Sequence, residues 1–313
     1  NNMADKVLMK GNEAIAEAAI RAGCRFYFGY PITPQTEIAA YMAKRMPKIG
    51  GTFLQAESEV AAINMVYGAA SAGVRSMTSS SSPGISLKSE GLSYMAGADL
   101  PALVVNVQRG GPGLGGIQPS QADYFQATKG GGHGDYHMIV LAPASVQEMA
   151  DLTVKAFTLA DQYRMTAMIL ADGTMGQMME PVSLDLDIPP VPEKPWATTG
   201  TQCKRKHNII NSLSLVPEEL EQLNRARYAK YAEIERNEVM VEEYMMDDAE
   251  YCIVAFGIAA RVSKNAIAEA RKAGIKVGLI RPITLWPFPT EAIARAADRV
   301  KHFISVELSM GQM

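Results

Sequence analysis

Apolar and polar residues along the first half of the chain follow two alternating repeats. Short runs of consecutive apolar residues, typical of strands buried on both faces, occur at 26–28, 53–54, 102–105 and 168–170. Between them, apolar residues recur every three or four positions, as in helices, over 12–22, 57–72 and 145–160. Ser145, with Glu148 three residues later, forms a capping-box pattern that predicts the start of the last helix. Strands alternating with helices predict a parallel sheet covered on both faces.

The pattern changes after residue 184. Prolines crowd between 188 and 195 and predict an extended linker, and the highly charged segment 218–243 has the spacing of a solvated helix. A second alternation then begins, with strands predicted at 251–255, 277–280 and 303–306 and helices at 259–273 and, capped by Thr290, up to 297.

These changes divide the chain into three parts. We expect a doubly wound α/β domain over 1–190, a linker with a charged helix over 191–247, and a second α/β domain over 248–313. The sequence stops soon after the last predicted strand, so we expect this second domain to be truncated.

Composition narrows the class of protein. The 313 residues are 48% hydrophobic and 20% charged, a globular balance, and a net charge of −3 gives no sign of a nucleic-acid-binding surface. No apolar run reaches the roughly 18–20 residues that cross a bilayer, and no signal peptide is visible, so we expect a cytoplasmic protein without membrane or nucleic-acid partners. Three distant cysteines, Cys24, Cys203 and Cys252, predict no disulfide framework and no cysteine-bound cluster; we expect each to be a small buried residue.

Residues that carry chemistry follow the predicted strands, where parallel α/β sheets place their sites. Thr33 lies in the turn Gly-Tyr-Pro-Ile-Thr-Pro and presents a hydroxyl there; a plain strand-to-helix connection explains it equally well. Glu59 stands in the first turn of the helix after strand 53–54, where the helix dipole alone accounts for a carboxylate.

Three small-residue segments complete this edge. The run 78–84 (Thr-Ser-Ser-Ser-Ser-Pro-Gly) reads as a turn before a helix that lets a ligand or partner approach the backbone, or as a flexible loop. Arg109 follows strand 102–105 and opens a glycine-rich loop, a combination that suits an anion fork with a lid. The loop 130–134 contains His133, which alone is weak evidence for catalysis.

The joint order of these segments resembles the alpha subunit of 2-oxoacid:ferredoxin oxidoreductases over nearly the whole chain, including a transketolase C-terminal-like domain at the end. Between 110 and 121 the loop looks most like the branched-chain, 2-oxoisovalerate type. The 2-oxoglutarate type usually has Pro-Ser-Thr-Gly where this chain has Pro-Gly-Leu-Gly at 112–115, which makes 2-oxoglutarate the alternative substrate.

The resemblance implies a mechanism and a set of partners. Thiamine diphosphate would lie between this pyrimidine-side subunit and a beta subunit that holds the diphosphate. Glu59 would bind the aminopyrimidine nitrogen and promote formation of the ylid, while Thr33 and Arg109 would bind the substrate carboxylate. The reaction would be oxidative decarboxylation of the 2-oxoacid to an acyl-CoA, with electrons passed to ferredoxin.

The chain lacks several parts of such an enzyme, and we expect it to be active only with partners. The family's metal motif is Gly-Asp-Gly with an Asn about 25–30 residues later; the nearest match, Ala171-Asp172-Gly173, has no Asn at that spacing. We therefore expect Mg²⁺ and the iron–sulfur clusters on a beta subunit and on small gamma and ferredoxin-like subunits. A transketolase-like chain, an indolepyruvate oxidoreductase and a non-catalytic α/β scaffold subunit remain the other interpretations.

Overall fold

A computed structural model of the chain describes residues 6–313. Its larger sheet has seven strands in the order β12-β6-β7-β5-β4-β2-β3, all parallel except β12. The longest pair, β5 and β7, matches Ala102–Gln108 with Thr166–Asp172, and every residue of both strands is buried. The strands are β2 (Phe26–Gly29), β3 (Thr52–Gln55), β4 (Ser76–Ser80), β5 (Ala102–Gln108), β6 (Ile139–Leu141), β7 (Thr166–Asp172) and β12 (Thr284–Trp286).

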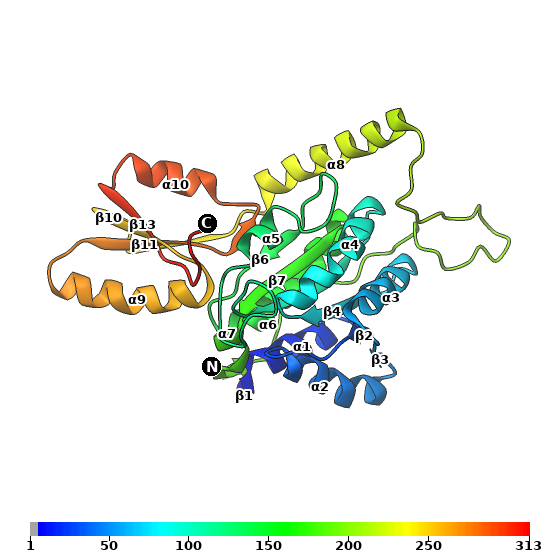
Figure 1. Cartoon of the computed structure of the whole chain (residues 1–313), viewed down its shortest axis with the longest axis horizontal. Helices are drawn as coiled ribbons and strands as arrows, with labels where there is room; N and C mark the ends of the chain where they lie inside the picture. Colours follow the sequence, from blue (N-terminus) through cyan, green and yellow to red (C-terminus); the bar gives the residue numbers. More distant parts are fainter. Residues whose placement is uncertain (1–5) are drawn as a thin grey trace.

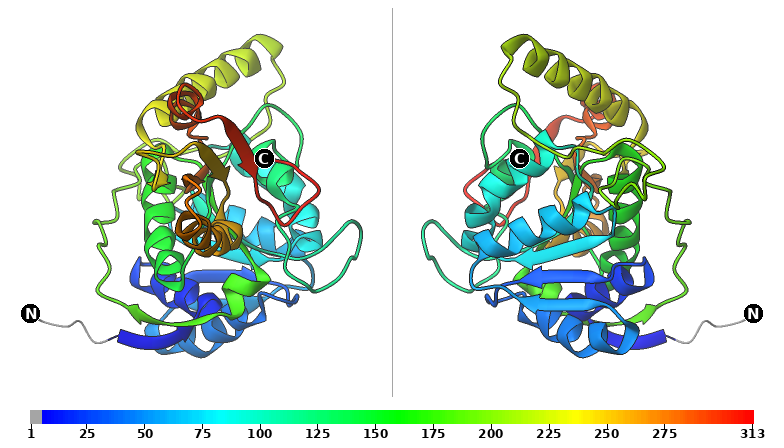
Figure 2. Two further views of the ribbon diagram at one scale, coloured as in Figure 1. Left: turned by 90° about the vertical axis from the view of Figure 1, so that its left-hand side faces the viewer. Right: turned by 90° about the vertical axis from the view of Figure 1, so that its right-hand side faces the viewer.

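Helices cover both faces of this sheet (Figures 1 and 2). α1 packs against α2 and α6 on one face, and α3 packs against α4 on the other, as right-handed crossovers require. A two-stranded ribbon of β1 (Lys6–Lys10) and β8 (Met179–Ser183) lies beside α1 and α6. The helices are α1 (Gly11–Arg21), α2 (Thr36–Arg45) with the 3₁₀ turn η1 (Met46–Ile49), α3 (Glu59–Ser71), α4 (Pro83–Gly97), α5 (Tyr124–Thr128), α6 (Val146–Tyr163) and α7 (Gly173–Gln177).

The second sheet has four strands in the order β13-β10-β11-β9 and carries α9 and α10. Its elements are β9 (Val241–Tyr244), β10 (Tyr251–Val254), α9 (Gly257–Lys272), β11 (Val277–Pro282), α10 (Thr290–Ala297) and β13 (His302–Ser305). The same part of the chain donates β12 to the edge of the larger sheet, beside β6.

One arginine joins the two sheets. Buried Arg281 on β11 forms a two-pronged ion pair with Glu148 of α6, at 2.7 and 2.8 Å, and a second with Glu242 of β9 at 2.6 Å. A bidentate guanidinium–carboxylate pair fixes orientation as well as distance, so the second sheet is held in a defined position against the first.

The segment between the sheets has no helix or strand from residue 185 to 216, with turns near 195 and 202, and then forms α8 (Pro217–Asn237). Lys194 anchors the extended part through Asp161, at 2.6 Å, and the same carboxylate binds Arg75 at 2.8 Å; all three side chains are buried. Figure 1 shows the linker as a long excursion on one side of the molecule.

The doubly wound α/β fold predicted for the first part is confirmed, and so is the second α/β unit. Three local predictions were wrong. The charged helix ends at Asn237, and 241–244 forms β9 of the second sheet. Thr290 is the first helical residue of α10, after Pro289. In the predicted capping box, Ser145 accepts the N–H of Glu148 as expected. The Glu148 carboxylate does not bond back to Ser145, because it accepts the N–H of Ala144 and pairs with Arg281.

The burial of residues in the structure contradicts two further predictions. Residues 78–80, read as part of a turn, belong to β4, whose five residues are all buried. Cys24 and Cys252 are buried as expected, but Cys203 is exposed in the linker. No helix among residues 6–313 combines the length and apolarity needed to cross a membrane. The division at residues 190 and 247 stays a prediction.

Candidate active site

The carboxyl ends of five parallel strands bring the candidate residues to one edge of the larger sheet. Thr33 follows β2, Glu59 follows β3, Ser82 follows β4, Arg109 follows β5, and Asp172 ends β7. In the sheet, β4 lies between the strands that precede Thr33 and Arg109. The guanidinium of Arg109 nevertheless crosses that distance and donates from Nη1 to the carbonyl oxygen of Thr33 at 3.0 Å.

Glu59 is the first residue of α3 and is only 6% exposed, whereas Glu57 lies on the surface. Ser58 caps this helix by accepting the N–H of Ala61 at 3.1 Å, which leaves the Glu59 carboxylate at the positive end of the dipole. No group within residues 6–313 donates a hydrogen bond to that carboxylate. The carboxylate oxygens are therefore free to accept hydrogen bonds from a ligand.

The turn after β4 leaves room for the Glu59 carboxylate. A Cβ added to Gly84 would lie 2.8 Å from Glu59 Oε1 and would collide with Ser80 Oγ, so only glycine fits. The hydroxyls of Ser80 and Ser81 are buried and have no partner within the described chain. Ser82 adopts φ 21° and ψ −80°, a conformation that non-glycine residues rarely adopt and that concentrates at functional sites.

A polar network connects this turn to the loop that carries Arg109. Ser82 Oγ donates to Asp123 at 2.6 Å and accepts the backbone N–H of Arg109 at 3.0 Å. Asn106 bridges from below: its amide donates to Asp123 at 2.8 Å and accepts the N–H of Ser82 at 3.1 Å. Burial raises the pKa of Asp123, against the hydrogen bonds from Ser82 and Asn106 that lower it.

Arg109 was expected to present a free anion fork, and its side chain is engaged differently. It is 7% exposed, and Nη2 donates to the carbonyl of Leu114 at 3.0 Å, which ties the glycine loop back onto its own first residue. Nε is buried and has no partner within residues 6–313. Both occupied partners are backbone carbonyls of loops, so an anion could displace them without breaking an ion pair.

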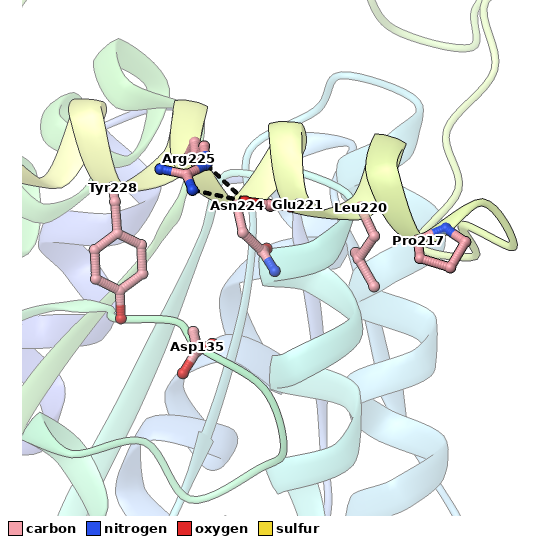
Figure 3. Close-up of a pocket in the computed structure, with 7 residues that line it drawn as sticks. All are labelled: Asp135, Pro217, Leu220, Glu221, Asn224, Arg225 and Tyr228. Carbon is pink, nitrogen blue, oxygen red and sulfur yellow. Dashed lines mark hydrogen bonds and ion pairs between the residues drawn. The ribbon is translucent and has the colours of Figure 1, made fainter.

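Two cavities flank these elements. One, of about 460 Å³, is lined by Ser82, Asp123, the loop from Gly110 to Gly113 and the tail residues Met310 and Gln312, with Pro83, Ser86, Ala122 and Gln126. The other, of about 550 Å³, lies between α8 and Asp135 at the end of the loop containing His133 (Figure 3). Neither lining includes Glu59, Arg109 or Thr33, but the first cavity is lined by Ser82 and Asp123, which form the polar network with the backbone of Arg109, so we assign the candidate site to that cavity and its surroundings.

Asp172 is engaged within its own loop. Its Oδ1 caps α7 by accepting the N–H groups of Thr174 and Met175 at 2.8 and 3.2 Å. Burial raises the pKa of this carboxyl to about 6, against those hydrogen bonds. Within residues 6–313, no three His, Cys, Asp or Glu side chains gather as a metal site.

Comparison with known families agrees with this geometry. Residues 17–244 match the family model described as pyruvate flavodoxin/ferredoxin oxidoreductase, thiamine diphosphate binding. The chain belongs to this family. Residues 249–313 match core domain II of pyruvate:ferredoxin oxidoreductase. The resemblance to 2-oxoacid:ferredoxin oxidoreductases, and membership of an enzyme class whose members act as subunits of complexes, are therefore confirmed.

Relatives named for two different 2-oxoacids differ in their sequence identity to this chain. Ketoisovalerate oxidoreductase subunit VorB of Methanothermobacter marburgensis is 55% identical over 98% of this chain and 87% of its own length. The 2-oxoglutarate synthase subunit KorA of Archaeoglobus fulgidus is 38% identical over 98% of this chain and 89% of its own length. The predicted likeness to the branched-chain type is thus stronger than the likeness to the 2-oxoglutarate type.

Solved structures agree with the fold. The 2-oxoglutarate:ferredoxin oxidoreductase from Magnetococcus marinus aligns with a TM-score of 0.87 at 32% identity and covers 97% of this chain. This chain spans 58% of that protein's chain. A split-gene transketolase aligns over 95% of this chain and 79% of its own at 13% identity and a TM-score of 0.59, which supports the transketolase-like fold alone.

One residue of the site was missed by sequence reasoning. Lys88 on α4 is fully buried, and its Nζ has no hydrogen-bond partner within residues 6–313. Burial lowers its pKa to about 8, and the negative charge of Glu59 acts in the opposite direction. In the sequence it stands in Ser-Leu-Lys-Ser-Glu, a polar run that gives no signal of burial.

Proposed function

We propose that this chain is the pyrimidine-side subunit of a thiamine-diphosphate-dependent oxidoreductase that converts a branched-chain 2-oxoacid, ketoisovalerate, to an acyl-CoA and reduces ferredoxin. The observation that carries the proposal is the buried Glu59 carboxylate, which has no donor of its own beside a turn that only glycine fits. Higher identity to proteins named for ketoisovalerate than to those named for 2-oxoglutarate favours the branched-chain substrate.

The residues at this edge fit the pyrimidine half of thiamine diphosphate. An amino-substituted ring offers a protonated nitrogen to a carboxylate, and Glu59 supplies that carboxylate in a site shielded from water. When bound, the cofactor supplies the electron sink for decarboxylation of the 2-oxoacid. Glu59 would orient the ring and hold a proton at the ring nitrogen.

Arg109 and Thr33 would bind the carboxylate of the substrate. The partnerless Nε of Arg109 is available to an anion, and its Nη atoms would exchange loop carbonyls for carboxylate oxygens. The Thr33 side chain is exposed beside this guanidinium. Asp123 and Ser82 would keep the backbone of Arg109 in place while the glycine loop moves.

The diphosphate, its Mg²⁺ and the iron–sulfur clusters would belong to partner subunits. Asp172 is the nearest match to a diphosphate–metal motif, but its carboxylate caps α7. We infer a beta subunit with the diphosphate site, and small gamma and ferredoxin-like subunits that carry electrons to ferredoxin. This assembly would be cytoplasmic, where oxidised ferredoxin and CoA are available.

The test uses the chain alone and the complex that co-purifies with it. We expect the lone chain with thiamine diphosphate and Mg²⁺ to form no acyl-CoA, and the complex to form it with a higher kcat/KM for ketoisovalerate than for 2-oxoglutarate. Turnover by the lone chain would contradict the division between subunits. A preference for 2-oxoglutarate would establish the alternative substrate, and absence of turnover with any 2-oxoacid would favour a scaffold role.

A further inference from the structure

Lys88 occupies a place where a lysine is costly. It is 0% exposed, and its ammonium group makes no hydrogen bond within residues 6–313. A buried charge without a partner destabilises a fold, and an apolar side chain of similar length would fill the same volume without that penalty. Such a residue therefore points to a function rather than to packing.

The helix register directs Lys88 to Glu59. Gly84, Lys88 and Gly91 are spaced by four and three residues and so share one face of α4. At both ends this face touches α3: a Cβ on Gly84 would meet Glu59 Oε1 at 2.8 Å, and one on Gly91 would meet Ile63 at 2.5 Å. Lys88 lies between these two contacts, against the first turns of α3.

Few other charges act on Lys88. Glu59 is the only acidic or basic residue of α3. Burial lowers the pKa of Lys88, and the negative charge of Glu59 opposes that shift. On α4 itself, Glu90 is exposed and binds Tyr94. β7, which also contacts α4, contributes only Asp172, whose Oδ1 caps α7. Glu59 and Lys88 thus form an isolated pair of opposite buried charges without a direct hydrogen bond.

We propose that Lys88 is a positioning residue, whose buried ammonium group attracts the Glu59 carboxylate and keeps it directed toward the aminopyrimidine of thiamine diphosphate. The inference rests on the proposed function and extends it to a residue that touches neither cofactor nor substrate. The missing direct bond matters: both carboxylate oxygens stay available to the ring while the positive charge behind them holds the carboxylate in place.

Lys88→Met in the complete complex tests this. The variant keeps the buried volume and removes an ammonium group without a hydrogen-bond partner, but it also leaves Glu59 without its counter-charge. Because these effects oppose each other, we expect a melting temperature within a few degrees of that of the wild type at pH 7. We expect kcat to fall, and the dissociation constant of thiamine diphosphate, titrated calorimetrically into the cofactor-free complex with Mg²⁺, to rise, each by about tenfold, the effect of one nearby opposite charge. Lys44→Met on the surface of α2 removes the same charge elsewhere and should change neither value.

Lys88→Arg separates charge from structure. Arginine keeps its positive charge at high pH, so it should restore cofactor affinity at least partly and move the alkaline limb of the pH–kcat profile upward from about 8, where Lys88 loses its proton. Equal loss of activity and melting temperature in both Lys88 variants would overturn the proposal, as would an unchanged cofactor titration in Lys88→Met. If Glu59→Gln also leaves cofactor affinity and turnover unchanged, the proposed function itself is wrong. If Lys88→Met changes neither quantity but Glu59→Gln does, only the role of Lys88 is wrong.

Discussion

Glu59→Gln is the substitution that probes the candidate site most directly. Gln has nearly the same size and shape, so the packing of α3 against Gly84 and the cap from Ser58 should persist. What changes is the charge: a neutral amide replaces a buried carboxylate, and the ring nitrogen of the cofactor loses an ionised partner.

The magnitude follows from burial. A hydrogen bond to a charged group contributes about 1.5–3 kcal/mol, and in a site where Glu59 is only 6% exposed the upper part of that range applies. At about 1.36 kcal/mol for each factor of ten, this alone slows the reaction about tenfold to more than a hundredfold. Loss of proton transfer adds to it, since general acid–base function contributes about a hundredfold or more. We therefore expect kcat to fall by at least about a hundredfold.

The assay is CoA-dependent reduction of an artificial acceptor by the complete complex, saturated with thiamine diphosphate and with ketoisovalerate. Glu57→Gln is the matched control, because Glu57 lies two residues earlier on the surface and should leave kcat unchanged. Melting curves of both variants should overlap within a few degrees. If the Glu57 variant is the inactive one, or if Glu59→Gln retains full turnover, the assignment of the carboxylate is wrong.

The other predictions concern substrate binding and the ion pairs that hold the molecule together. Arg109→Ala should raise KM for the 2-oxoacid and leave the melting temperature nearly unchanged. An unchanged KM with a lower melting temperature in calorimetry would mean that Arg109 serves only to bind the carbonyl of Leu114 and hold the loop. Arg281→Met should destabilise the chain by about 2 kcal/mol in denaturant titrations, since Glu148 and Glu242 lose their partner but are partly solvated; no change would show that the two sheets are held by packing alone. Asp161→Asn should cost about 3–5 kcal/mol, because Arg75 stays buried without its counter-charge; a loss below about 1 kcal/mol would mean that this triad adds little.

Sequence reasoning located the strands whose residue types reveal that they are buried. β5 and β7 are buried on both faces and therefore read as apolar runs. β4 is equally buried, but its residues are Ser-Met-Thr-Ser-Ser, and small hydroxyl side chains look like a turn. Ser80 lies at the edge of the sheet beside Glu59 and Gly84. The small polar residues near the candidate site are therefore the reason that this strand could not be recognised in the sequence.

Long-range contacts account for the remaining differences. Glu148 has the spacing of a capping box, but Arg281, 133 residues later, competes for its carboxylate. The glycines after Arg109 indicated a lid, and nothing local indicated that Leu114 would bind its guanidinium. The position of Glu59 in the first turn of α3 was predictable, because a strand and an apolar helix flank it in sequence; its catalytic role stays a prediction. Lys88 was not, since only the packing of α4 on α3 buries it.

Strand β12 has a consequence for how the chain is made. Ile139–Leu141 is an inner strand only because Thr284–Trp286 pairs with it; 142 residues lie between Leu141 and Thr284 in synthesis order. At about 5–20 residues per second, a ribosome needs roughly 7–30 seconds to deliver the missing strand. Throughout that interval the nascent first domain presents an apolar, unpaired strand edge, the kind of surface that recruits other chains. Newly made protein should therefore depend on chaperone protection, and fragments that stop before residue 284 should aggregate, because they also lack the core residues Leu285 and Trp286.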